Sequence, residues 1–64
     1  MLVTIEDLRS RARELAREAN ILSGLAFSLA ENTKDDATRG KAAYISDLAA
    51  DTRESMTDWL AASN

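Results

Sequence analysis

Small and large apolar residues alternate along the first half of the chain at spacings of three and four. This pattern constrains the fold more than any other feature. Its positions are Ile5, Leu8, Ala12, Leu15, Ala19, Leu22, Ala26 and Leu29. Such spacings place side chains on one face of an α-helix, and more than three heptads of them are typical of helices that pack along their length. After the first position Leu and Ala alternate. We therefore expect small residues to let two helix axes approach while Leu side chains fill the space between them.

The first helix is predicted over about residues 5–31. Thr4 can cap its start, and Asp7 three residues later can complete a capping box, less strongly than Glu would. Pro is absent and Gly occurs twice, while strong helix formers fill the chain.

The segment "ENTKDDA" interrupts the helical pattern. Asn32 tolerates the left-handed conformation that can close a helix, and Thr33 with Asp36 forms a second Thr-x-x-Asp cap. These signals predict a turn at 32–34 and a second helix over about 34–62. So short a connection implies antiparallel neighbours.

The second helix carries a wider and less regular apolar stripe than the first. If the hairpin is antiparallel, Trp59 should lie near Ile5 and Leu8. The predicted buried positions are Thr38, Ala42, Ile45, Leu48, Ala49, Thr52, Met56, Trp59 and Leu60.

A chain of 64 residues forms one domain, here spanning 1–64, and a single copy has a thin core. Small domains usually compensate with disulfides, a metal or oligomerisation. Cys and His are both absent, so self-association is the remaining route. The predicted fold is all-α: an antiparallel two-helix hairpin that dimerises into a four-helix bundle. Apolar residues on the flanks of the first helix favour the same assembly. The predicted dimer interface comprises Ile21, Leu22, Leu25, Leu29, Tyr44 and Leu48.

The formal net charge of −3 argues mildly against bulk electrostatic binding to nucleic acid or to an anionic membrane. No apolar run approaches the roughly 20 residues of a membrane span, and the start lacks the pattern of a signal peptide. We therefore expect a cytoplasmic protein.

The residues required by common catalytic motifs are missing. The chain has no His or Cys, no Gly-rich phosphate loop and no G-x-S-x-G elbow. Two helices also cannot easily enclose a dry pocket that would shift the pKa of a carboxylate. We expect neither enzymatic activity nor a cofactor or metal.

One candidate surface is basic and lies on the first helix. Arginines recur every four residues at Arg9, Arg13 and Arg17, and the same side continues through Asn20, Gly24 and Phe27. Arginines beside an exposed aromatic residue could grip phosphate and stack a base. The simpler interpretation is a solvated face, because acids lie among the arginines. Helical pair spacing joins Glu6 to Arg9, Asp7 to Arg11 and Glu14 to Arg17. This simpler interpretation is favoured, since nucleic-acid binders normally have a net positive footprint.

The other candidate surface is acidic and lies on the second helix. Its members, which we call the acidic row, are Asp47, Asp51, Glu54 and Asp58. Charged outer faces are ordinary in helical bundles, yet acids near a helix C-terminus oppose the helix dipole. The row could bind arginines of a partner protein.

Gly24 and Gly40 interrupt the two helical patterns, each at a cost of about 1 kcal/mol relative to Ala. Either glycine could permit close approach of another backbone, or could simply be tolerated.

The Ala/Leu layering, the chain length and the single tight turn resemble the Rop-like RNA-binding proteins, which are dimers of helical hairpins. Members of that family bind paired RNA loops through polar residues and a Phe on the first helix. The positions here that could play this part are Asn20 and Phe27, with Arg13 and Arg17.

The segments "RELAREANILSGLAFSLAEN" and "GKAAYISDLAADTRESM" resemble small helical-hairpin proteins of Pseudomonas species and their phages. The resemblance covers about residues 11–56, and the matching element of the second helix is Ala43-Tyr44-Ile45. Some phage members bind and antagonise host proteins, among them quorum-sensing transcription regulators. The resemblance therefore implies a protein partner.

Together these patterns predict a homodimeric protein-binding inhibitor or adaptor that masks a partner surface. It would contact a partner with a basic surface through the acidic row and Phe27. The alternatives are a Rop-like RNA-binding bundle and a purely structural oligomerisation module.

Overall fold

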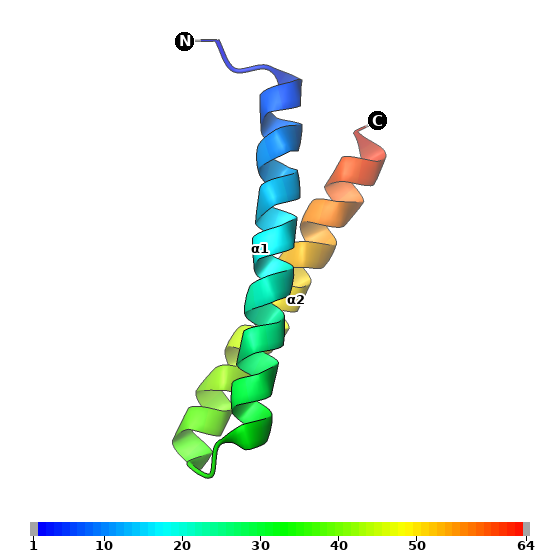
Figure 1. Ribbon diagram of the computed structural model, residues 1–64. Helices are drawn as coiled ribbons and strands as arrows, with labels where there is room; N and C mark the ends of the chain where they lie inside the picture. Colours follow the sequence, from blue (N-terminus) through cyan, green and yellow to red (C-terminus); the bar gives the residue numbers. More distant parts are fainter. Residues whose placement is uncertain (1, 64) are drawn as a thin grey trace.

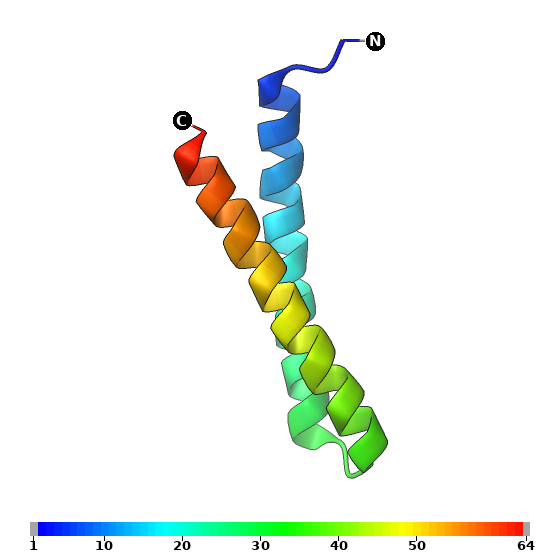
Figure 2. The same cartoon turned by 180° about the vertical axis from the view of Figure 1, so that it is seen from behind.

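The computed structural model describes residues 2–63, and within them the chain forms two α-helices and no strand. Helix α1 spans Ile5–Asn32 and helix α2 spans Asp36–Ala62. The helices run in opposite directions from one turn and cross as they extend away from it (Figures 1 and 2). The predicted antiparallel helical hairpin is therefore confirmed.

The start of α1 is fixed by the predicted capping box. The Asp7 backbone N–H donates to the Thr4 hydroxyl at 3.2 Å, and the Thr4 backbone N–H donates to the Asp7 carboxylate at 3.0 Å. These bonds satisfy two backbone donors that the first turn of a helix leaves without partners.

The end of α1 differs from the prediction, because Asn32 does not adopt a left-handed conformation. Among the described residues none has a positive φ. The C-cap is Thr33, in an extended conformation, and its N–H donates to the Leu29 carbonyl at 3.0 Å. The Asn32 side-chain amide instead donates to the Ser28 carbonyl at 2.7 Å. The Asn32 side chain therefore satisfies a carbonyl of the last helical turn, and no residue adopts the left-handed conformation there.

The start of α2 also differs, because Asp35 rather than Thr33 is its N-cap. The Asp35 carboxylate accepts from the Thr38 backbone N–H at 3.0 Å and from the Thr38 hydroxyl. The prediction that the helix starts at about residue 34 was therefore wrong by two residues. Thr33 supports the turn instead, accepting from the Asp35 N–H at 3.2 Å. A carboxylate gains more than a hydroxyl from the positive end of the helix dipole.

The seam between the helices consists of small side chains. The buried residues are Ala12, Ala19 and Ala26 on α1 and Ala42 and Ala49 on α2. The four Leu residues of the predicted Ala/Leu pattern (Leu8, Leu15, Leu22 and Leu29) remain 47–51% exposed. The expected layering is thus divided: Ala packs inside the hairpin, and Leu lies along one edge of the seam.

Two serines form reciprocal hydrogen bonds across the seam. The Ser23 hydroxyl donates to the Ser46 carbonyl at 3.2 Å, and the Ser46 hydroxyl donates to the Ser23 carbonyl at 3.4 Å. Each short side chain reaches the backbone of the other helix, which requires closely spaced helix axes.

Candidate interaction surfaces

One side of the hairpin is a continuous apolar surface, which we call the apolar face. It starts beside Trp59 and Leu8, near the chain ends, and extends towards the turn. Its members from α1 alternate with the buried Ala positions, so the heptad that builds the seam also builds this face. The residues of the apolar face are Leu8, Leu15, Ile21, Leu22, Leu25, Leu29, Ile45, Met56 and Trp59.

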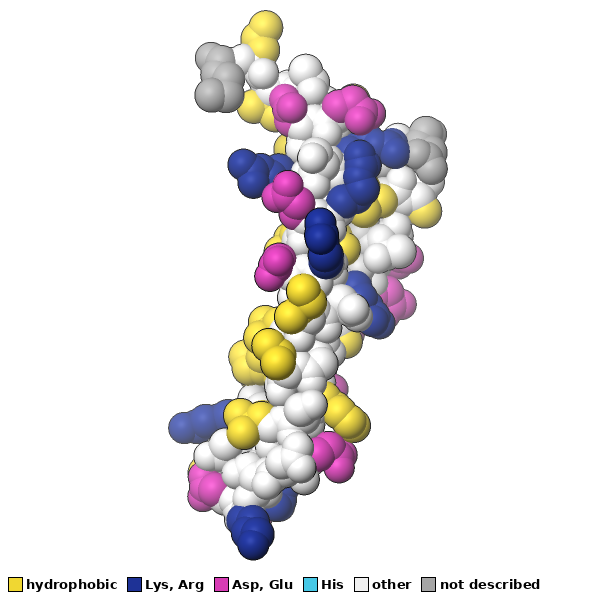
Figure 3. Space-filling view, in the orientation of Figure 1, with side chains coloured by type: hydrophobic (Ala, Val, Ile, Leu, Met, Phe, Trp, Pro, Cys, Tyr) yellow, Lys and Arg dark blue, Asp and Glu magenta, His cyan; other side chains and the backbone are white. Residues whose placement is uncertain are grey.

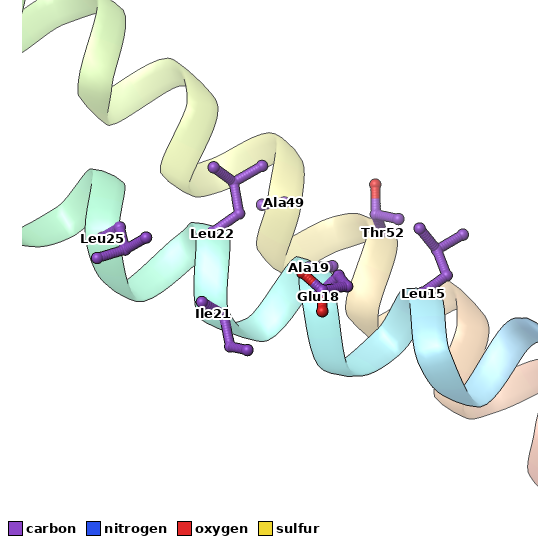
Figure 4. Close-up of a pocket in the computed structure, with 8 residues that line it drawn as sticks. All are labelled: Leu15, Glu18, Ala19, Ile21, Leu22, Leu25, Ala49 and Thr52. Carbon is purple, nitrogen blue, oxygen red and sulfur yellow. The ribbon is translucent and has the colours of Figure 1, made fainter.

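Three open hollows follow one another along the apolar face. Alanines line the hollows, with Leu side chains between them. In the middle hollow, Leu15, Leu22 and Thr52 point to the same side, whereas Ile21 points away from them (Figure 4). Each hollow includes one charged side chain: Arg11 near the chain ends, Glu18 in the middle and Lys41 near the turn.

Most of the predicted dimer interface lies on or beside the apolar face. Leu22, Leu25 and Leu29 line its hollows. Leu48 follows Ile45 by almost one helical turn and is 49% exposed. Tyr44 is 66% exposed and lines none of the three hollows, so the structure does not group it with the others.

The other side of the seam is polar, and side chains there join the two helices. We call it the polar face and define it by Arg9, Asn20, Arg53 and Ser63. The Arg9 guanidinium donates to the Ser63 carbonyl at 2.7 Å, near the C-terminus of α2. Arg53 donates to the Asn20 side-chain oxygen at 2.8 Å. The hairpin therefore satisfies much of its polar face internally.

Phe27 lies on the same side of the seam as the polar face, but nearer the turn. It is 58% exposed and lines a shallow hollow with Arg39 and Asp47. The structure therefore brings Phe27 together with one member of the acidic row, Asp47.

All four residues of the acidic row are exposed. Within residues 2–63 none of them forms an ion pair, and the last turn of α2 contains no basic residue. The row is therefore a negatively charged strip with no neutralising partner in the described part of the chain.

The basic candidate surface gains a residue that sequence reasoning missed. Arg13 and Arg17 are exposed, and Asn20 accepts the hydrogen bond from Arg53 of α2. No sequence pattern indicated this pairing, because it depends on how the two helices are aligned. Lys and Arg side chains gather beside the N-terminal half of α1 in Figure 3, and hydrophobic side chains gather closer to the turn.

Surface ion pairs on α1 agree only partly with the spacings in the sequence. Arg9 and Glu6 lie 3.6 Å apart, as expected. Arg11 pairs with Glu14 at 3.2 Å, rather than with Asp7, whose carboxylate accepts the capping hydrogen bond. Among residues 2–63, no ion pair joins Glu14 to Arg17.

Comparison with protein-family models, with curated proteins and with solved structures finds no match to this chain. Across residues 2–63, no cluster of three or more His, Cys, Asp or Glu side chains could hold a metal ion. Neither helix, as far as it is described, combines the length and hydropathy needed to cross a membrane.

Proposed function

We propose that this protein is a protein-binding module, a small inhibitor or adaptor that acts by masking a surface of another protein. The observation that carries the proposal is the exposed Phe27 beside the acidic row. Phe27 is 58% exposed and lines a shallow hollow with Asp47, a member of that row. Exposed apolar side chains rimmed by polar residues mark sites of macromolecular contact, whereas small-molecule sites bury most of their ligand.

The partner would bind at the acidic row and the adjoining Phe27 hollow. Asp47 belongs to both, so an aromatic anchor and a negative strip meet on one outer surface. A complementary partner would have a basic surface and an apolar side chain to set against Phe27. Interface anchors are often aromatic, and complementary charge contributes mainly to specificity and association rate.

Charge reversal in the acidic row tests this proposal. The tagged protein is used to capture partners from a nuclease-treated bacterial lysate, and the retained proteins are identified. Asp51→Lys combined with Glu54→Lys should abolish capture. Glu6→Lys combined with Glu14→Lys changes the net charge equally, on α1, and should leave capture intact. Equal retention by both double variants would contradict binding through the row.

RNA binding is the second candidate, and the hydrogen bond between Arg53 and Asn20 favours it. This bond adds a cation from α2 to the side that carries Arg13 and Arg17. Arg13→Glu combined with Arg17→Glu should then abolish RNA retention, and nuclease should remove everything captured. A lysate that yields neither protein nor RNA would instead indicate a structural oligomerisation module.

A further inference from the structure

We propose that a second copy of this chain covers the apolar face, with the turns of both hairpins at the same end of a four-helix bundle. This inference concerns a different surface from the acidic row, so each proposal can fail without the other.

One hairpin exposes more surface than a compact monomer of the same mass. Its accessible surface is 4986 Å², whereas a compact monomer of 7.0 kDa should expose about 4,000 Å². The excess of about 1,000 Å² is close to the roughly 800 Å² that each partner contributes to a standard interface.

The dimensions of the hairpin point the same way. Its radius of gyration is 14.7 Å. A compact domain of 64 residues should have about 11 Å, and one of 128 residues about 14 Å. A single chain already has the extent of a domain twice its length.

The apolar face is also complementary to itself. Leu8, Leu15, Leu22 and Leu29 recur every seven residues, or about 10.5 Å along α1. The three hollows lie between these leucines and therefore have the same spacing. The leucines of one copy can consequently enter the hollows of another, as knobs enter holes in coiled coils.

The charged residue in the middle hollow decides between two symmetric arrangements. Two faces that pack together can be related by a two-fold axis across the helices or along them. An axis across the helices puts the turns at opposite ends and sets α1 against α1. Glu18 lies at the midpoint of Ile5–Asn32, so the Glu18 carboxylates of the two copies would face each other beside the axis.

An axis along the bundle removes this conflict. Each α1 then lies over α2 of the other copy, and the turns share one end. Within one copy, Glu18, Ala49 and Thr52 line the same hollow and so lie at the same height along the bundle. Glu18 of one copy therefore lies opposite Ala49 and Thr52 of the other. Arg11 meets the level of Trp59, where a guanidinium can stack on an indole. The same-end arrangement therefore keeps the two Glu18 carboxylates apart and gives Arg11 an aromatic neighbour.

Spin-label distances test both parts of the proposal, because a chain without cysteine accepts one label at a chosen site. Sedimentation should first give twice the 7.0 kDa chain mass at micromolar concentration. Labels at Lys34→Cys, in the turn, should lie within about 25 Å of each other in the same-end arrangement. In the opposite-end arrangement about 40 Å of helix would separate them.

The matched control is Arg17→Cys, near the middle of α1. Position 17 lies at about the same height along the bundle in both copies in either arrangement, so its labels should be separated only across the width of the bundle. A resolved distance there verifies that the labelled protein is paired. A stably folded species of 7.0 kDa would contradict the proposal that a second copy covers the apolar face. A resolved distance at position 17 together with a distance near 40 Å at position 34 would overturn the same-end arrangement.

Discussion

The apolar face and the polar face flank the same alanine seam, yet they differ in how far a single chain completes them. On the polar face, hydrogen bonds join α1 to α2 through Arg9 with Ser63 and through Arg53 with Asn20. On the apolar face, Leu side chains line hollows that no part of the described chain fills.

This difference separates the contacts that hold the hairpin together from the surface that is exposed to other chains. Alanines are buried where the two helices meet, and hydrogen bonds within the chain link the helices on the polar face. The apolar face gains its main stabilisation only when it is removed from water, at about 25 cal/mol per Å². The four variants below test this division, from the largest expected effect to the smallest.

Leu22→Asp should have the largest effect, because it places a charge between the middle hollow and the hollow nearest the turn. A buried carboxylate without a partner is costly, so the dimer dissociation constant should rise at least about 100-fold, or about 2.7 kcal/mol. Sedimentation over a dilution series measures it. The control is Ser28→Asp, at an exposed position of the same helix. Equal effects of the two substitutions would mean that the apolar face is not an interface.

Ala19→Leu tests the seam itself. Ala19 is only 5% exposed, and a Leu side chain there would force the two helix axes apart. We expect a loss of about 1–3 kcal/mol in the free energy of unfolding, as overpacking usually costs. Urea unfolding followed by circular dichroism gives the value, with Ser28→Leu as the exposed control. An unchanged stability would show that the seam is looser than its burial indicates.

Gly24→Ala should stabilise the protein, because a Cβ at this position meets nothing within 4 Å and the backbone is helical. The expected gain is about 0.8–1 kcal/mol, from the higher helix propensity of Ala. Gly40→Ala provides the same comparison on α2. A loss of stability or of pairing from either substitution would show that another chain approaches that glycine closely.

Asp35 should give a small pH effect at the turn, where the two faces end. Hydrogen bonds from the Thr38 hydroxyl and from its backbone N–H hold the pKa of the Asp35 carboxyl below its ordinary value of 3.8. A lowered pKa means that this stabilisation is complete above about pH 4 and is lost as the pH falls through the folded-state pKa. Asp35→Asn retains a cap but cannot titrate.

Thermal unfolding measured from pH 5 to pH 2 should therefore show a shallower acid decline for Asp35→Asn than for the unchanged protein. Identical slopes would mean that the cap does not contribute to the pH dependence.

The sequence predicted the helices better than it predicted their ends. Thr4 and Asp7 formed the expected box, since Thr4 is the one residue of a capping type in the segment 1–5. At the turn, Thr33, Asp35 and Asp36 are all possible caps within four residues. The geometry of the turn selects among them, and a pattern of residue types does not contain that geometry.

The sequence also did not show that the Ala positions would be buried within the hairpin and the Leu positions half exposed. Heptad spacing shows that both lie on one broad face, but it does not show where the centre of contact falls. In the structure the centre falls on the small residues, and the Leu side chains lie to one side. Contacts between the helices, such as Arg53 with Asn20, depend on the same alignment and could not be predicted. The partner-binding residues remain predictions.

Trp59 is an intrinsic fluorescent probe of the hollow that it borders. It is the only tryptophan, it is 37% exposed, and it borders the hollow beside Leu8 at the end of the hairpin away from the turn. Indole emission shifts to shorter wavelength when water around the ring is replaced by apolar groups. Fluorescence during dilution or partner titration would therefore follow occupation of that hollow without any added dye.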